Sequence, residues 1–541
     1  MKTSLTIIII GVLSALLFTH SLGNAHLFDW DEINFAESAR EMIVSGNFER
    51  VQINFHPFWE KPPLFIWMQV ISMKLFGINE FAARFPNAIA GILTLTSLFL
   101  IGTELRNSKF GIWWAICYGC SFLPHMYFKS GIIDPWFNLF IFFSFYFFIK
   151  NATLKSNSYY IELSGLFLGL AVLTKGPVAI LIVGCAIISL AIVHVRQFNL
   201  SLKCIALLAT VTSLFTVAWF GWEVYKNGFQ FIDEFITYQI RLATTKDAGH
   251  GGFIGYHIVV LLIGCFPASL FLFSSKKYLW ESNDLAMTRK GMTVLLAVVI
   301  ILFSIVKTKI VHYSSLAYFP ISFLAAYSIL VVLSEKYISK LIRILILVLG
   351  IIWSLLLIIL PLIGENKSLL KWMTKNDLFA TQNMNAEVDW PIWLTLPGIL
   401  LIIGVILFYI VSKNKLKLSL AIQILFITSL LIIQSITTFF IPRIEQYTQR
   451  AAIDFYKTKS KENVPIETLY FKSYAQYFYG NSKPENAILN KDSLIRTSPT
   501  GFYFVSKVTD KKKVIENYSA YLEIDSEKNG FVFYKSRYFN K

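Results

Sequence analysis

The sequence is poor in charge and in cysteine. Only 15% of its 541 residues are Asp, Glu, Lys or Arg, whereas 55% are hydrophobic and the mean hydropathy is +0.58. So little charge excludes the class of soluble globular proteins. All five cysteines lie inside apolar runs, so we predict no disulfide framework, and the Cys117-Tyr-Gly-Cys120 spacing lacks the second ligand pair of a metal site. The sequence also has no solenoid-type repeat and no low-complexity tract.

Long apolar runs take up most of the chain. Many are roughly 17–25 residues long, the length that a helix needs to cross about 30 Å of hydrocarbon, whereas a β-barrel strand needs about half as many residues. We therefore predict an all-α polytopic membrane protein with about 13 transmembrane helices. The candidate spans are 4–20, 87–104, 110–128, 132–150, 160–174, 176–195, 203–221, 257–273, 292–306, 312–333, 339–363, 392–412 and 418–440.

The formal net charge of +16 comes from lysines and arginines that are spread over short loops. No basic stripe forms, so we predict no nucleic acid partner and interpret these residues as charges that orient the helices in a lipid bilayer. With the N-terminus inside, every even-numbered loop carries Lys or Arg, as the positive-inside rule requires. The long loops 21–86, 222–256 and 364–391 then lie outside. Segment 1–25 has features of a signal peptide, but we expect it to remain as the first helix.

Two domains are expected. Residues 1–440 form the transmembrane domain, whose first outer loop, 21–86, is predicted to carry interfacial helices because its apolar stretches are too short to span. The tail, 441–541, is richer in Lys, Asn, Ser and Tyr and has short alternating apolar runs. This pattern predicts a small, soluble α/β domain outside the membrane.

Ionisable residues gather at the predicted outer boundary of the membrane. Asp31 and Glu32 follow the first span closely, and Lys61 precedes two prolines between apolar stretches. Lysines on the outer side run against the orientation rule, and charges at membrane depth are costly, so these residues indicate a function. The candidate site residues are Asp31, Glu32, Arg40, Glu60, Lys61, Asp134, Lys175, Arg241, His250, Lys307, Lys309, His312 and Tyr313.

This set of residue types favours chemistry on a lipid phosphate. Ammonium and guanidinium groups at the interface suit a phosphate or diphosphate whose lipid tail stays in the bilayer. A carboxylate takes a proton from an acceptor hydroxyl, or it holds a divalent cation beside the leaving phosphate. Together these groups indicate glycosyl or phosphoryl transfer from a lipid-linked donor on the outer side.

Structural roles stay open for the same residues. Asp31 and Glu32 also suit the first turn of a helix, where the helix dipole favours acidic side chains. Asp134 also suits a helix cap, and Lys307 and Lys309 also suit flanking lysines that extend to the membrane interface. The Glu-Lys pair of the first loop is also compatible with a surface ion pair of little energetic value. The isolated histidines are equally typical of structural positions.

Several motifs carry a family resemblance. They are DEINFAESAREMIVSGNF and FHPFWEKPPLFIWMQV in the first loop, followed by SGIIDPWFNLF, LTKGPVAI and FSIVKTKIVHYSSLAYFP. The sequence resembles the polyprenyl-phosphate-sugar-dependent glycosyltransferases of the GT-C superfamily. Within that superfamily it is similar to the bacterial group that includes aminoarabinose transferase of lipid A and is related to the protein O-mannosyltransferases. The resemblance covers roughly residues 1 to 440.

The resemblance implies a function and roles for residues. It implies inverting transfer of a sugar from a polyprenyl-phosphate donor to lipid A, another envelope glycan or a protein, with the active site on the periplasmic side of the bacterial cytoplasmic membrane. The Asp-Glu pair and a second acidic position would be catalytic; metal ligands are unknown, and a divalent cation is left open as a cofactor. The resemblance implies catalytic roles for Asp31 and Asp134 and donor-phosphate-binding roles for Lys61, Lys175, Arg241 and Tyr313. From their positions in the sequence we add Glu32 to the catalytic residues and Lys307 and Lys309 to the donor-phosphate-binding residues, with Arg40, Glu60, His250 and His312 as supporting residues.

Two other classes compete with a transferase. A multi-span transporter or flippase of a lipid-linked or anionic substrate would place polar groups near the middle of the bilayer and would show two related halves. A lipid-binding scaffold would bind lipid phosphate without forming a product. Here the ionisable residues cluster on one side and no paired halves are visible, so we favour the transferase.

Overall fold

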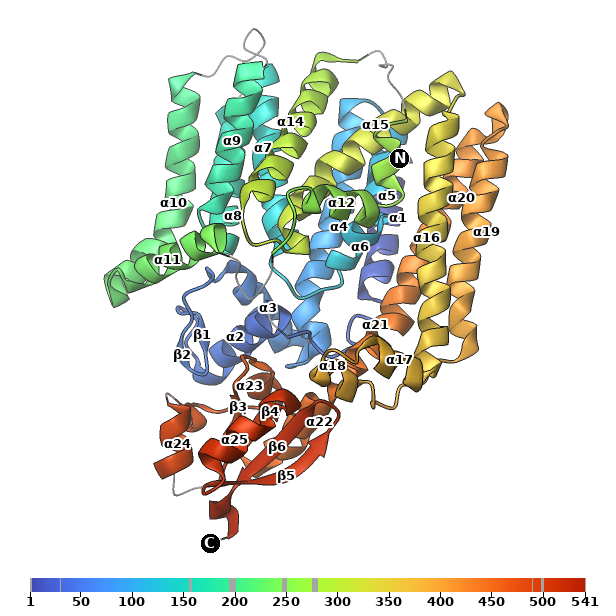
Figure 1. Ribbon diagram of the computed structural model, residues 1–541. Helices are drawn as coiled ribbons and strands as arrows, with labels where there is room; N and C mark the ends of the chain where they lie inside the picture. The colour runs from blue at the N-terminus through green and yellow to red at the C-terminus, as the bar shows by residue number, and fades with distance from the viewer. Residues whose placement is uncertain are drawn as a thin grey trace.

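The computed structural model describes residues 2–29, 31–154, 158–193, 201–245, 251–274, 281–488, 490–497 and 501–540. It is a mostly helical molecule in which a bundle of long helices lies above a small sheet domain in the view of Figure 1. Seven helical segments within these ranges are long and apolar enough to cross a membrane. The predicted fold class is confirmed, whereas the number of crossings stays a prediction.

Every predicted span coincides with helix in the described ranges, although two of them are interrupted. The candidate span 110–128 divides into two helices, and the span 257–273 divides at Pro267, whose ring nitrogen has no hydrogen to donate to a helix. The bundle helices are α1 (Lys2–Thr19), α4 (Glu80–Leu105), α5 (Ser108–Gly119), α6 (Phe122–Tyr127), α7 (Asp134–Leu154), α8 (Ser158–Lys175), α9 (Val178–Val193), α10 (Leu202–Asn227), α12 (Tyr256–Gly264), α13 (Ala268–Phe271), α14 (Asn283–Ile305), α15 (Tyr318–Glu335), α16 (Lys340–Glu365), α19 (Leu396–Val411) and α20 (Leu418–Ser435).

The first loop folds into a compact layer of its own. Helix α2 (Asp31–Ser45) begins with two acidic residues, which favour a helix N-terminus, and α3 (Leu64–Phe76) begins directly after the two prolines. Between them, β1 (Gln52–Ile53) pairs with β2 (His56–Pro57) in an antiparallel hairpin. Figure 1 shows this layer between the helix bundle and the sheet domain.

Three short helices complete the layer around the first loop. Helix α11 (Gln230–Thr244) lies across the end of α10 in Figure 1. Helices α17 (Lys367–Met373) and α18 (Leu378–Asn383) follow α16, and the backbone N–H of Gly530 in the C-terminal domain donates to Asn383 Oδ1 at 3.0 Å. The predicted outer loops 222–256 and 364–391 therefore contain helices in their described parts.

The C-terminal domain is a four-stranded mixed sheet with helices, as the alternating pattern of the tail predicts. Its strand order is β3-β4-β6-β5; β3 and β4 are parallel, and the other neighbours are antiparallel. One hydrophobic cluster contains residues of both α2 and this domain, so the domain and the first loop share a core. The elements are α21 (Ile441–Gln446), α22 (Arg450–Lys459), β3 (Ile466–Leu469), α23 (Ala475–Tyr479), α24 (Lys491–Thr497), β4 (Tyr503–Lys507), α25 (Lys511–Tyr518), β5 (Leu522–Lys528) and β6 (Phe531–Ser536).

Candidate active site

Four predicted site residues meet where the helix bundle faces the first loop. His312 Nε2, in the 3-10 helix η2 (Val311–Ala317), lies 3.5 Å from Asp31 Oδ2. Lys175 Nζ, at the end of α8, donates to Asp134 Oδ1 at 2.7 Å. The Asp31 side chain is 38% exposed, whereas that of Asp134 is 4% exposed. Asp31 is therefore the accessible carboxylate of the pair.

Lys61 belongs to the same cluster. Its side chain is buried, and its charge interacts with those of Glu60, Asp31, Lys175 and Asp134. Burial lowers the pKa of the Lys61 ammonium below its ordinary value, and the charges of Glu60, Asp31 and Asp134 oppose that shift only in part. Burying the Lys61 ammonium therefore costs free energy. We interpret this cation as a group that would attract an incoming anion.

Aromatic rings surround the cationic groups. Lys175 Nζ lies 5.6 Å from the centre of the Tyr313 ring, and Lys61 Nζ lies 5.0 Å from the centre of the Tyr238 ring. The Arg241 guanidinium lies 5.1 Å from the same Tyr238 ring. Tyr238 was missed at the sequence level; its position three residues before Arg241, on the same face of a helix, was the available signal.

Glu32 has a different environment from its neighbour Asp31. Its carboxylate is 5% exposed and accepts two hydrogen bonds from Arg84, at 2.9 and 2.8 Å, as well as backbone N–H groups of Phe28 and Gly131. Burial alone would raise the pKa of Glu32, but the Arg84 charge and these hydrogen bonds lower it below the ordinary value. Its oxygens are occupied, so we interpret Glu32 as a positioning residue rather than a base.

Arg84 ties the start of the first loop to the helix bundle. Besides Glu32, its guanidinium donates to the carbonyl oxygens of Leu22, Ala25 and His26 at 2.8–3.0 Å. Arg84 was not among the predicted site residues, and the predicted second span began only at residue 87. An arginine just before an apolar run was the signal that pointed to it.

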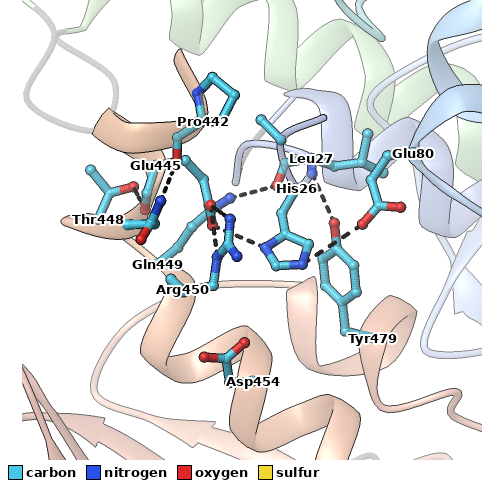
Figure 2. A network of polar contacts seen from close by, with 12 residues as sticks. His26, Leu27, Glu80, Pro442, Glu445, Thr448, Gln449, Arg450, Asp454 and Tyr479 are labelled. Atoms are coloured by element: carbon cyan, nitrogen blue, oxygen red, sulfur yellow. Dashed lines mark hydrogen bonds and ion pairs between the residues drawn. The ribbon is translucent and has the colours of Figure 1, made fainter. Parts of the chain in front are cut away.

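The C-terminal region fixes the other side of the same segment (Figure 2). Gln449 Nε2 donates to the carbonyl of Leu27 at 2.7 Å, its Oε1 accepts the backbone N–H of Asp29 at 3.1 Å, and the Leu27 N–H donates to the Tyr479 hydroxyl at 2.8 Å. His26 Nδ1 lies 3.1 Å from Glu445 Oε1. Residues 26–29, which lead directly into Asp31, are therefore held from both sides.

The remaining predicted residues have other surroundings. Lys309 Nζ donates to three carbonyls at the end of α14, at 2.6–2.7 Å, so it caps that helix. Arg40 is buried against Glu37 in α2, and Lys307 is exposed. Glu60 Oε1 lies 3.7 Å from Lys472 Nζ of the C-terminal domain. His250 lies outside the described residues.

Metal ligands do not assemble in the described ranges. No group of three or more His, Cys, Asp or Glu side chains there has the arrangement of a metal site. The acidic groups of the cluster are engaged with Lys175 and His312 instead. We therefore assign no residue to a cation.

The fold and the sequence were compared with those of known proteins. Residues 60–222 match the model of the dolichyl-phosphate-mannose-protein mannosyltransferase family. The fold matches the crystal structure of ArnT from Cupriavidus metallidurans bound to undecaprenyl phosphate, with a TM-score of 0.74, 15% identity, and coverage of 98% of this chain and 97% of that chain. The predicted resemblance to GT-C glycosyltransferases is therefore confirmed.

Within that class, the sequence is similar to aminoarabinose transferases. It is 28% identical over 288 residues to undecaprenyl phosphate-alpha-4-amino-4-deoxy-L-arabinose arabinosyl transferase of Shewanella sediminis, covering 51% of each chain. It is 26% identical over 324 residues to the protein of that name from Pectobacterium carotovorum, covering 59% of this chain and 58% of the other. The sequence matches thus span about half of the length of these curated relatives. The helices and relatives support a multi-pass protein of the bacterial inner membrane.

Proposed function

We propose that this protein is an inverting glycosyltransferase that moves a sugar from a polyprenyl-phosphate donor to an acceptor on the periplasmic side of the cytoplasmic membrane. Residues 1–440 form its catalytic domain, and residues 441–541 form a domain outside the membrane. The observation that carries the proposal is the cluster in which an exposed carboxylate, Asp31, lies among the cationic side chains of Lys61 and Lys175. The acceptor class stays open between lipid A, another envelope glycan and a protein.

The cluster supports an in-line displacement. The acceptor oxygen forms a bond to the anomeric carbon of the sugar while the bond from that carbon to the phosphate oxygen breaks, and the electron pair leaves with the polyprenyl phosphate. Lys61, Lys175 and Arg241 stabilise the negative charge that develops on the leaving phosphate, where little water competes. Lys175 is fixed for this role by Asp134.

Asp31 has one of two roles, depending on the acceptor. For an acceptor hydroxyl, Asp31 takes the proton as general base, and His312 at 3.5 Å orients its carboxylate. For an acceptor phosphate, no strong base is needed, and Asp31 orients the acceptor or the sugar. Glu32 and Arg84 hold the backbone that presents Asp31 in both cases.

The test is Asp31→Asn. We expect transfer to fall by about 10²–10⁴-fold if Asp31 is the general base, while the lipid-phosphate sugar accumulates in cells. Mass spectrometry of lipid A, polyprenyl-phosphate lipids and envelope glycoproteins, from native, deletion and variant strains at matched expression, provides the measurement. The same spectra identify the acceptor, because the acceptor fraction loses the mass of the transferred sugar in the variant and deletion strains.

The matched control is Asp284→Asn. Asp284 is also an acidic residue in the first turn of a bundle helix, but it lies at the opposite end of the bundle. We expect this variant to retain activity. Unchanged lipid and protein fractions in the Asp31→Asn strain, with the protein present and folded, would contradict the catalytic role.

A further inference from the structure

A groove on the C-terminal domain lies beside the first loop and has no role in the displacement described above. Its volume is about 500 Å³, and it is formed by the end of β3, the segment that leads to α23, and Lys491 of α24. Its lining includes Tyr470, Phe471, Lys472, Ser473, Tyr474 and Tyr477.

The groove is in contact with the motif that carries Lys61. Lys472 Nζ lies 3.7 Å from the carboxylate of Glu60, the residue before Lys61. The Tyr474 ring packs edge-on against Phe58, with 6.3 Å between ring centres. A molecule in the groove would therefore reach the vicinity of the proposed donor phosphate site without crossing the bundle.

The polar groups at the floor of the groove bond to one another. Lys491 Nζ donates to the backbone carbonyl of Thr468 at 2.8 Å and pairs with the buried carboxylate of Glu467 at 3.0 Å. The Tyr477 hydroxyl donates to the same carboxylate at 2.7 Å. Because these groups are engaged with one another, the floor supplies shape, and binding groups must come from the walls and the rim.

The walls combine aromatic rings with charged and hydroxyl groups. Tyr474 and Tyr477 stack with 6.2 Å between ring centres, Tyr470 is 46% exposed, and the Lys472 side chain is 51% exposed. A sugar ring has a C–H face that packs on an aromatic ring and hydroxyl groups at its edge that bond to charged or hydroxyl side chains. Concave sites with apolar walls and a few polar groups at the rim are typical of small-ligand binding.

We propose that this groove binds a saccharide unit of the acceptor and so directs it towards Asp31. The inference rests on the proposed function, and it favours a glycan-bearing acceptor over a polypeptide. The sugar ring packs against the tyrosines, while Lys472 and Glu60 bond to its hydroxyl groups. Lys472 and Tyr470 then determine which acceptor is used and take no part in the chemistry.

Binding to the full-length protein in detergent tests the inference. The probes are chitobiose as a disaccharide, glycerol as a polyol without a ring, inorganic phosphate as a bare anion, and a serine-rich peptide; saturation-transfer NMR reports contact and affinity. We expect chitobiose to bind, and Tyr470→Ala and Lys472→Ala each to weaken it by about fivefold to tenfold. Both side chains are exposed enough for the variants to fold. Lys512→Ala, an exposed lysine on α25 of the same domain, is the matched control.

Donor binding is measured on the same samples with undecaprenyl phosphate, so that the two proposals fail separately. Retained lipid-phosphate binding together with weakened chitobiose binding in the two groove variants supports the inference. Retained lipid-phosphate binding with no chitobiose signal, with equal signals for glycerol or phosphate, or with groove-dependent binding of the peptide alone overturns the groove assignment and leaves the transferase proposal standing. Loss of lipid-phosphate binding in the wild type would count against the transferase proposal itself.

Discussion

Charged side chains are buried to different extents at the two ends of the helix bundle. At the end that faces the C-terminal domain, Glu32 and Asp134 are nearly fully buried and are held by Arg84 and Lys175. At the opposite end, charged residues line a cavity of about 480 Å³, but Glu104, which pairs with a lysine there, is 59% exposed. Burying charge is costly, so the two carboxylates that are only 5% and 4% exposed mark the place where charges do more than orient helices.

Among the substitutions considered, Arg84→Ala should destabilise the protein most, because it removes the partner of a buried carboxylate. It leaves the Glu32 carboxylate buried without its partner, which costs about 3–5 kcal/mol. We expect a lower melting temperature in detergent and a loss of transfer activity. Arg84→Ala combined with Glu32→Gln should recover part of the stability, because no buried charge is left unpaired. Equal destabilisation by the single and double variants would show that the ion pair itself is unimportant.

Gln449→Ala should disturb the segment before Asp31 from the other side. It removes two hydrogen bonds, to the carbonyl of Leu27 and the N–H of Asp29, and each unsatisfied group costs about 1–3 kcal/mol. We expect the turnover rate to fall while the KM for the donor changes little, because Asp31 is misplaced and the lysines are not. Gln446→Ala is the matched control, since that side chain bonds only within its own helix in the described contacts. A change in donor KM alone would argue against a positioning role.

Lys61→Arg should change how donor binding depends on pH. Lys61 attracts a phosphate only when protonated, and burial lowers its pKa, so protonation is lost at a lower pH than for an ordinary lysine. Donor binding by the wild type should therefore weaken as the pH rises through that lowered pKa. The arginine variant stays charged and should keep its affinity to higher pH. Titrations of undecaprenyl phosphate binding across pH provide the measurement, with Lys512→Arg as the exposed control. Superimposable profiles for the wild type and Lys61→Arg would remove Lys61 from the phosphate site.

Lys150→Ala, at the opposite end, should have the smallest effect. Its partner Glu104 is mostly exposed, and ion pairs of this kind contribute about 0–1 kcal/mol. We expect activity and melting temperature close to those of the wild type. A loss as large as that of Arg84→Ala would erase the distinction between the two ends.

Much of the fold could be predicted from the sequence, because a membrane helix is recognised by the apolar composition of one continuous segment. The first-loop helix α3 and the C-terminal sheet domain also follow from local patterns. The candidate residues Asp31, Lys61 and Lys175 stood out because charge near an apolar run is rare, and the structure brings them together.

The rest depends on contacts between distant segments. Nothing local distinguishes Asp31 from Glu32, because the difference is made by Arg84 and by the N–H of Gly131. Gln449 and Tyr479 lie in a tail whose register against the first loop cannot be read from composition. The capping role of Lys309 likewise appears only when its ammonium is seen among three carbonyls.

The hydrogen bond between Leu27 and Tyr479 also has a consequence for the order in which the chain folds during synthesis. The two residues are 452 positions apart in the chain. At a synthesis rate of about 5–20 residues per second, roughly 20–90 seconds pass between the appearance of the first and that of the second. The first loop is synthesised early, but its hydrogen bond to Tyr479 can form only when the chain is nearly finished. The segment before Asp31 therefore obtains all of its described contacts only after the C-terminal domain has been synthesised.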